Sequence, residues 1–175
     1  MEQMREHKVL IDEEAIERMV KRLADRINED YKGERLIVIG VLKGSFMFMS
    51  DLLKQLRMDT EVYFLKASSY GNGTQTSGTV KITKDIERDI DGENVLIVED
   101  IIDSGFTMRE VLKLLSARNP KSLKLCSCLS KPSRREVDVE INYLGFEIPD
   151  EFVIGYGLDY AEKYRNLPYV GVIEA

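Results

Sequence analysis

A dense group of acidic, hydroxyl and glycine residues follows an apolar run near the middle of the chain. After residues 95–98 come Glu99, Asp100, Asp103, Ser104, Gly105 and Thr107. Free backbone N–H groups at a strand-to-helix turn bind anions, and a glycine lets the backbone approach a phosphate closely. Carboxylates beside such a turn would repel a bare phosphate, so the ligand must bring Mg²⁺, sugar hydroxyls or a proton to be accepted. A phosphorylated ribose meets these needs, whereas any one of these residues alone would suggest only a helix cap or a solvated side chain.

The spacing of apolar residues predicts the elements that position this group. Short apolar runs at 36–42, 95–98 and 123–129 are typical of buried parallel strands. Helices are expected after Asp12, over 45–56 and over 104–117, and further strands at 60–66, 79–82, 139–143, 152–155 and 169–173. Strands that alternate with helices predict an α/β fold with a mainly parallel central sheet flanked by helices.

The carboxyl ends of parallel strands form the ligand-binding edge of such a sheet. Lys43 and Gly44 follow the first buried run, the acidic group follows the second, and Lys131 follows the third. We therefore expect these residues to share one crevice.

Composition limits the class of function. The 175 residues include 25 Lys and Arg against 31 Asp and Glu, a net charge of −6, which suits one domain spanning residues 1–175. An acidic chain argues against a protein that coats nucleic acid or anionic membrane. The N-terminal residues lack the apolar core of a signal peptide, so we expect a cytoplasmic protein with no membrane or nucleic-acid partner. Cys126 and Cys128 are expected to be buried apolar residues in a reducing compartment, because two thiols alone make no metal site.

Residues 95–108 resemble the phosphoribosyl-diphosphate-binding signature of the phosphoribosyltransferases. Other segments are similar to the 6-oxopurine (hypoxanthine-guanine) enzymes of that family: Val41-Leu42-Lys43-Gly44 to their pyrophosphate loop, Ser69-Tyr70 to the start of their mobile loop, and 145–150 and 153–160 to their base-binding region. The resemblance runs from about Val38 to the C-terminus. It implies the type I phosphoribosyltransferase fold, with a small hood subdomain built from the N-terminal segment and about 131–175.

The resemblance implies a purine-salvage reaction. The 5-phosphoribosyl group of phosphoribosyl diphosphate would pass, with Mg²⁺ as cofactor, to N9 of hypoxanthine or guanine, giving IMP or GMP. Homodimers or homotetramers are the expected assemblies. The alternative is an RNA-binding regulator on the same fold, which would add a basic face. The net charge of −6 disfavours it, and the nearest basic cluster, residues 131–135, is short.

The resemblance also implies a role for each site residue. Asp103 would be the general base and acid at purine N7. Glu99 and Asp100 would hold the ribose hydroxyls, directly or through Mg²⁺, and Asp159 would contact a second Mg²⁺ and the purine. The 5′-phosphate would be bound by Ser104, Gly105, Phe106 and Thr107. Pyrophosphate would be bound by Lys43, Gly44 and Arg165, and the purine by Lys131, Phe152 and Val153. The peptide bond before Lys43 is expected to be cis. Phe106, where some relatives have lysine, and Glu151, where some have lysine beside the stacking aromatic, depart from the pattern.

A lid is expected because water at ribose C1 would hydrolyse the donor. Residues 67–79 hold three glycines and many hydroxyls, which is typical of a mobile loop, and Ser69 and Tyr70 lie at its start. An idle hairpin loop is the alternative.

Overall fold

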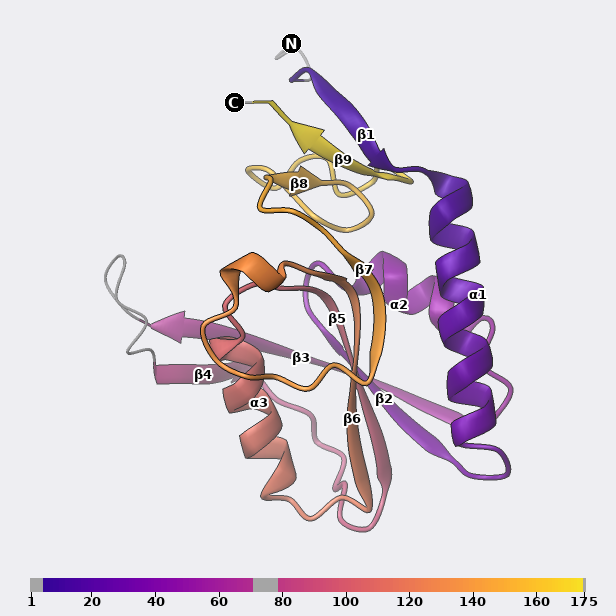
Figure 1. Ribbon diagram of the computed structural model, residues 1–175. Helices are drawn as coiled ribbons and strands as arrows, with labels where there is room; N and C mark the ends of the chain where they lie inside the picture. Colours follow the sequence, from indigo (N-terminus) through magenta and orange to yellow (C-terminus); the bar gives the residue numbers. More distant parts are fainter. Residues whose placement is uncertain (1–4, 71–78, 175) are drawn as a thin grey trace.

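A six-stranded sheet forms the centre of the molecule, with the strands in the order β4-β3-β2-β5-β6-β7 (Figure 1). The computed structural model describes residues 5–70 and 79–174. The strands are β2 (Leu36–Val41), β3 (Thr60–Tyr70), β4 (Thr79–Lys84), β5 (Asn94–Ile102), β6 (Ser122–Ser130) and β7 (Tyr143–Glu147). Every neighbouring pair is parallel except β3 and β4. The expected α/β fold with a mainly parallel sheet is confirmed.

Helices cover both faces of this sheet. Side chains alternate along β2, so that Val38 joins the cluster under α1 (Glu13–Asp30) and α2 (Phe46–Leu53), while Ile39 joins the cluster under α3 (Phe106–Ser116). Asp12 caps α1 as expected, because its Oδ1 accepts a hydrogen bond from Ala15 N at 2.8 Å. Cys126 and Cys128 are both buried, as expected, and both lie on the α1 side of the sheet. None of the described helices is long and apolar enough to cross a membrane.

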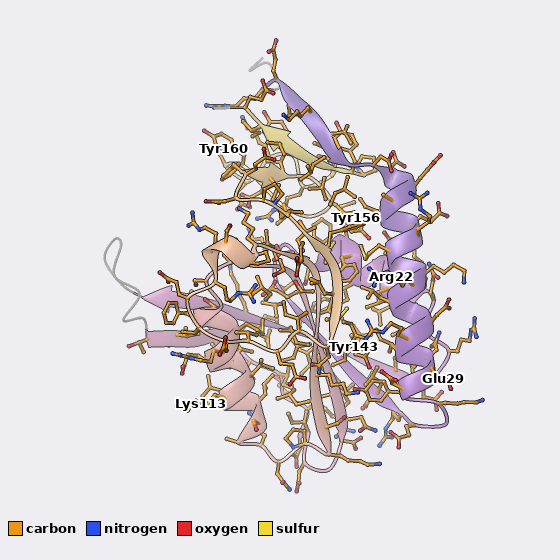
Figure 2. The ribbon with its side chains drawn as sticks, in the orientation of Figure 1. Arg22, Glu29, Lys113, Tyr143, Tyr156 and Tyr160 are labelled. Atoms are coloured by element: carbon orange, nitrogen blue, oxygen red, sulfur yellow. The ribbon has the colours of Figure 1, made fainter. Side chains whose placement is uncertain are left out.

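Polar side chains tie α1 to the edge strand β7. Figure 2 shows Arg22 and Tyr143 in the space between these two elements. Arg22 Nη2 donates to the carbonyl of Gly145 at 2.9 Å, and the Tyr143 hydroxyl donates to Asp30 in the last turn of α1. The helix is thereby fixed along the sheet.

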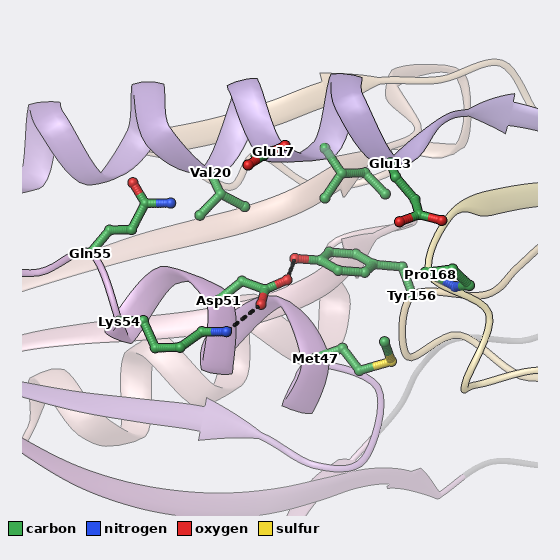
Figure 3. Close-up of a pocket in the computed structure, with 10 residues that line it drawn as sticks. Glu13, Glu17, Val20, Met47, Asp51, Lys54, Gln55, Tyr156 and Pro168 are labelled. Carbon is green, nitrogen blue, oxygen red and sulfur yellow. Dashed lines mark hydrogen bonds and ion pairs between the residues drawn. The ribbon is translucent and has the colours of Figure 1, made fainter.

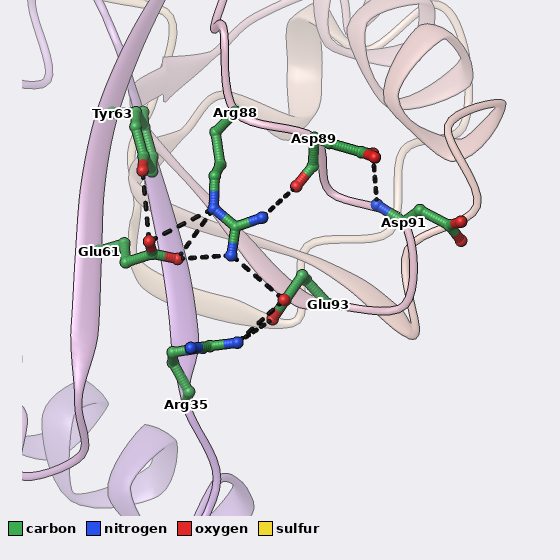
Figure 4. A network of polar contacts seen from close by, with 7 residues as sticks. All are labelled: Arg35, Glu61, Tyr63, Arg88, Asp89, Asp91 and Glu93. Carbon is green, nitrogen blue, oxygen red and sulfur yellow. Dashed lines mark hydrogen bonds and ion pairs between the residues drawn. The ribbon is translucent and has the colours of Figure 1, made fainter.

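The amino ends of three strands are joined by a charged network (Figure 4). Arg88 donates to Glu61 of β3 at 3.0 Å and to Glu93, which precedes β5, at 3.2 Å. Arg35, just before β2, also pairs with Glu93 at 3.0 Å. This network lies at the edge opposite the expected binding crevice, so we interpret it as structural.

A second, antiparallel sheet of three strands has the order β1-β9-β8. It joins β1 (His7–Ile11) to β9 (Val170–Ile173) and β8 (Val153–Ile154), so the two ends of the described chain lie together (Figure 1). Strand β1 was not expected, because this short segment mixes charged and apolar residues without clear alternation. Strand β7 falls within the expected hood range of about 131–175 and pairs with β6 in the central sheet.

Three expected boundaries also move. The strand expected at 139–143 begins only at Tyr143, because Val139 and Ile141 pack as irregular chain against the α3-side cluster. Strand β3 runs on to Tyr70 because residues 67–70 pair with β4, so the start of the expected lid is strand; residues 71–78 lie outside the described residues. Strand β5 continues to Ile102, which pairs with Ser130.

Candidate active site

The carboxyl ends of β2, β5 and β6 bring three loops to one edge of the sheet. Lys131 Nζ, after β6, lies 3.8 Å from Asp103 Oδ1, after β5. Gly44, after β2, lies so close to Asp100 that an added Cβ would be 1.6 Å from Asp100 Oδ2. Only glycine fits at position 44, and the three loops form one crevice.

Two adjacent carboxylates line this crevice from within β5. Glu99 and Asp100 belong to the strand itself, not to the loop after it as the sequence suggested. Glu99 Oε1 accepts a hydrogen bond from Asp100 N at 2.9 Å. Burial, and secondly the charge of Asp100, raise the pKa of Glu99 well above its usual value, and burial also raises the pKa of Asp100. Two crowded carboxylates of this kind favour a bound cation or a shared proton.

The start of α3 forms a small polar cavity. The helix begins at Phe106, two residues later than expected, after Gly105 with φ at 92°. Gly105 has no side chain to cap the helix, the Phe106 N–H makes only a long hydrogen bond of 3.4 Å to Ser104 Oγ, and the N–H groups of a first helical turn have no partner within the helix. The cavity measures about 280 Å³ and is lined by Glu99, Ile101, Ile102, Asp103, Ser104, Gly105, Thr107 and Met108. Size and donors suit a phosphate group.

Lys43 and Arg165 meet on the far side of the crevice. The Leu42–Lys43 peptide bond is cis, as the resemblance implied. Lys43 Nζ donates to Glu162 Oε2 at 2.9 Å, and Arg165 Nη2 lies 3.2 Å from Glu162 Oε1 and 3.4 Å from Asp159 Oδ1. Arg165 Nη1 donates to the carbonyl of Gly157 at 2.7 Å. Sequence reasoning found both cations but missed Glu162, for which the sequence holds no signal.

Lys131 is nearly buried between two carboxylates. Its side chain is 11 % exposed and lies 3.9 Å from Asp150 as well as 3.8 Å from Asp103. Arg135 holds the backbone beside it, because its Nε donates to the carbonyl of Asp103 at 3.0 Å and its Nη2 to Ser130 Oγ at 2.6 Å. Sequence reasoning took Arg135 only as part of a short basic cluster and missed this contact.

Phe152 presents an aromatic face beside this edge. It is 53 % exposed, unusual for so large an apolar side chain, and its ring packs edge-on against Tyr160 at 5.6 Å. Val153, the next residue, is buried in β8. Tyr160 falls in a segment that the sequence had singled out, but its contact with Phe152 depends on the loop fold. Ser69 and Tyr70 lie at the end of β3, and their side chains are outside the description.

Comparison with known proteins assigns the family. Residues 8–161 match the phosphoribosyl transferase domain family. The chain belongs to this family. Hypoxanthine phosphoribosyltransferase of Salmonella typhimurium is 53% identical over 167 residues, 94% of either chain. Hypoxanthine-guanine phosphoribosyltransferase of Bacillus subtilis is 49% identical over 167 residues, 95% of this chain and 93% of the relative.

Solved structures of the phosphoribosyltransferase family have the same architecture. A Bacillus anthracis hypoxanthine-guanine phosphoribosyltransferase with HEPES in its active site has a TM-score of 0.93 at 49% identity, covering 98% of this chain and 100% of that one. A Trypanosoma cruzi hypoxanthine phosphoribosyl transferase, solved to study the role of its C-terminal region in oligomeric state and activity, has a TM-score of 0.92 at 40% identity, covering 99% and 94%. The fold is that of type I phosphoribosyltransferases. These relatives are named as enzymes, and the alternative of an RNA-binding regulator gains no support from them.

The acidic residues suit a metal that arrives with its ligand. Across residues 5–70 and 79–174, no group of three His, Cys, Asp or Glu side chains is assembled to hold a metal ion. Asp159, expected as a metal ligand, is paired with Arg165. Mg²⁺ commonly uses one or two carboxylates together with substrate phosphates and waters. The Glu99–Asp100 pair, with its raised pKa values, fits that arrangement.

Proposed function

We propose that this enzyme transfers the 5-phosphoribosyl group of phosphoribosyl diphosphate to N9 of hypoxanthine or guanine, giving IMP or GMP and pyrophosphate in purine salvage. One observation carries the proposal: the polar cavity before α3, the Glu99–Asp100 pair and the two cations Lys43 and Arg165 surround a single crevice. A ribose with a phosphate at one end and a diphosphate at the other matches that spread of groups. The names of the relatives support a purine as acceptor.

The donor is held along this crevice in the proposed complex. Residues 104–107 (Ser104, Gly105, Phe106 and Thr107) bind the 5′-phosphate, chiefly through backbone N–H groups, so Phe106 serves as well as lysine. Glu99 and Asp100 bind the ribose hydroxyls and hold Mg²⁺, and Asp159 contacts a second Mg²⁺ once it leaves Arg165. When bound, Mg²⁺ neutralises charge on the diphosphate. Lys43, Gly44 and Arg165 bind the departing pyrophosphate.

Asp103 handles the proton of the purine in this proposal. Purine N9 attacks ribose C1, the C1–O bond breaks with its electron pair on pyrophosphate, and Asp103 accepts the proton at N7. Lys131 Nζ lies 3.8 Å from Asp103 Oδ1, beside the position of this proton. The same ammonium group donates to the 6-oxo group of the base. Adenine, which carries an amino group there, is thereby disfavoured.

The second sheet serves as the hood over the base. Phe152 offers an exposed ring for stacking, and the Val153 backbone reads the purine edge. Asp159 lies near the purine 2-position. Ser69 and Tyr70, at the end of β3, begin the proposed lid, whose remaining residues lie outside the described part of the chain.

We further propose that the protein is a cytoplasmic homodimer or homotetramer. Three large apolar side chains beside α2 are exposed, Phe46 at 43 %, Val62 at 41 % and Phe64 at 38 %. Val62 and Phe64 are two residues apart on β3 and therefore lie on one face of the strand, and exposed apolar surface is typical of protein interfaces. Phosphorylated substrates do not cross membranes unaided, which supports a cytoplasmic site of action.

A purine-specificity assay tests the proposed function. The purified protein is incubated with Mg²⁺, phosphoribosyl diphosphate and hypoxanthine, guanine, xanthine or adenine, and nucleotide products are separated by chromatography. We expect IMP from hypoxanthine or GMP from guanine, no product from adenine, and loss of activity on chelation of the metal. No product from any 6-oxopurine would reject the function.

A further inference from the structure

Glu162 occupies the space between the two cations assigned to pyrophosphate. Its Oε2 accepts a hydrogen bond from Lys43 Nζ at 2.9 Å, and its Oε1 accepts one from Arg165 Nη2 at 3.2 Å. Each carboxylate oxygen therefore serves a different cation. A diphosphate bound to Lys43 and Arg165 would need the same donor atoms.

The loop that carries Glu162 holds the carboxylate in this position. Glu162 N donates to Asp159 Oδ2 at 2.9 Å. Ala161 and Glu162 have φ values of 50° and 66°, in the left-handed region that side chains other than glycine rarely adopt. Such strained conformations cluster at switch and ligand-clamp segments and persist only where surrounding contacts hold them.

The charges in this cluster cancel. Lys43 and Arg165 face the carboxylates of Glu162 and Asp159 within 2.9–3.4 Å. The cluster therefore has no excess positive charge to attract an anion until the carboxylate of Glu162 or Asp159 moves away. Arg165 is also incompletely satisfied, because its buried Nε has no hydrogen-bond partner among the described residues. A rearrangement of Arg165 on ligand binding could supply that bond.

Resting on the proposed function, we propose that Glu162 is an internal competitor for the diphosphate group. In the free enzyme its carboxylate occupies the donor atoms of Lys43 and Arg165 and so prevents simple anions from binding there. It moves away when a diphosphate replaces both contacts. Glu162 then sets the affinity and the selectivity of the pyrophosphate site without touching the reacting atoms. Exposed ion pairs contribute little free energy, so displacement of the carboxylate is readily achieved.

The test compares Glu162→Gln with Glu29→Gln. Both variants remove one negative charge from an exposed side chain, but Glu29 lies on α1, away from the crevice (Figure 2). Isothermal titration measures binding of magnesium pyrophosphate and of inorganic phosphate, and steady-state kinetics give KM for phosphoribosyl diphosphate and for hypoxanthine. We expect Glu162→Gln to tighten binding of both anions by about 1.5- to 5-fold, as loss of a weak surface ion pair predicts. KM for phosphoribosyl diphosphate falls in parallel, KM for hypoxanthine stays constant, and Glu29→Gln matches the wild type.

Unchanged or weakened pyrophosphate binding in Glu162→Gln overturns the inference. Weakened binding would mean that Glu162 orders the cations for the ligand. If the wild-type enzyme forms IMP or GMP, either of these results in the variant rejects only the role of Glu162. A wild type that forms neither nucleotide rejects the proposed function itself.

Discussion

The carboxylate of Asp103 is half-exposed to the crevice, while its backbone is fixed by Arg135 and its charge faces Lys131. A general base needs this combination of access and fixed position. Both supporting residues come from the segment after β6, so the loop between β6 and β7 contributes to the proposed proton-transfer site.

Asp103→Asn tests the proton-transfer role. We expect kcat to fall by about 10²- to 10⁴-fold, because asparagine cannot accept the N7 proton. KM for phosphoribosyl diphosphate should change little. Asp138→Asn, at an exposed position on the same connection, is the control. A variant with unchanged kcat would reject Asp103 as the base.

The ion pair between Asp85 and Arg118 predicts how the stability of the fold depends on pH. Two hydrogen bonds from Arg118, at 3.0 and 2.6 Å, hold the pKa of Asp85 below its usual value. The pair therefore stabilises the fold above the unfolded-state pKa of about 3.9, and its contribution disappears as pH falls through the lower folded-state pKa. We expect Asp85→Asn to lower the free energy of unfolding at pH 7 by about 0.2–1 kcal/mol, a range discounted for an exposed pair.

Urea unfolding at pH 7 and at about pH 3 measures this difference. The difference in free energy of unfolding between wild type and Asp85→Asn should be smaller at the lower pH. A difference in free energy of unfolding that grows on acidification would contradict the stabilising role of the Asp85–Arg118 pair.

Single residues differ in how far sequence predicts them. Glu99, Asp100 and Asp103 are predictable because their order along one strand end already defines a binding edge. Glu162 and Tyr160 are not, because their partners Lys43 and Phe152 are reached only through the fold of the loop between β8 and β9. Positive φ at residues other than glycine leaves no mark in the sequence.

At the scale of elements, one hydrogen bond connects α2 to the loop that carries Arg165. The Tyr156 hydroxyl donates to Asp51 Oδ2 at 2.7 Å, and Lys54 lies 3.1 Å from the other oxygen (Figure 3). These residues line a cavity of about 460 Å³ between α1 and α2. Next to Tyr156, Gly157 packs so tightly on Gly44 that an added Cβ would lie 2.1 Å from the Gly44 carbonyl. The contact therefore helps to fix the backbone at Gly44, in the loop proposed to bind pyrophosphate.

Tyr156→Phe removes this bond with little change in shape. We expect the free energy of unfolding to fall by about 1 kcal/mol, because Asp51 loses a donor but stays partly solvated. Urea unfolding is the measurement. Tyr63→Phe is the control, since its hydroxyl makes only a 3.4 Å contact with Glu61. Equal stability of Tyr156→Phe and the wild type would contradict the structural role.

Among elements, the buried strands of the central sheet are the most predictable. Continuous apolar runs such as β2 have no other stable environment than a sheet covered on both faces. Short strands such as β1 and β7 are placed by their pairing partners, β9 and β6, and their own sequences carry no sufficient pattern.

At the scale of the whole molecule, the exposed apolar side chains beside α2 predict self-association. Phe64→Asp places a charge among these side chains and should give a protein near the monomer mass of 20.1 kDa in size-exclusion chromatography with light scattering. Leu114→Asp, on α3 at the other face and 42 % exposed, should keep the wild-type mass. A monomeric wild type, or a Phe64→Asp protein of unchanged mass, would contradict the proposed interface.

The pairing of β1 with β9 has a consequence for the order of folding. His7 pairs with Ile173, so almost the whole described chain lies between two neighbouring strands. Contacts between such distant residues form late, because the intervening chain must first be ordered. The second sheet is therefore expected to close last and to open first. A partly opened molecule would keep the polar cavity before α3 and lose the surface that we propose recognises the base.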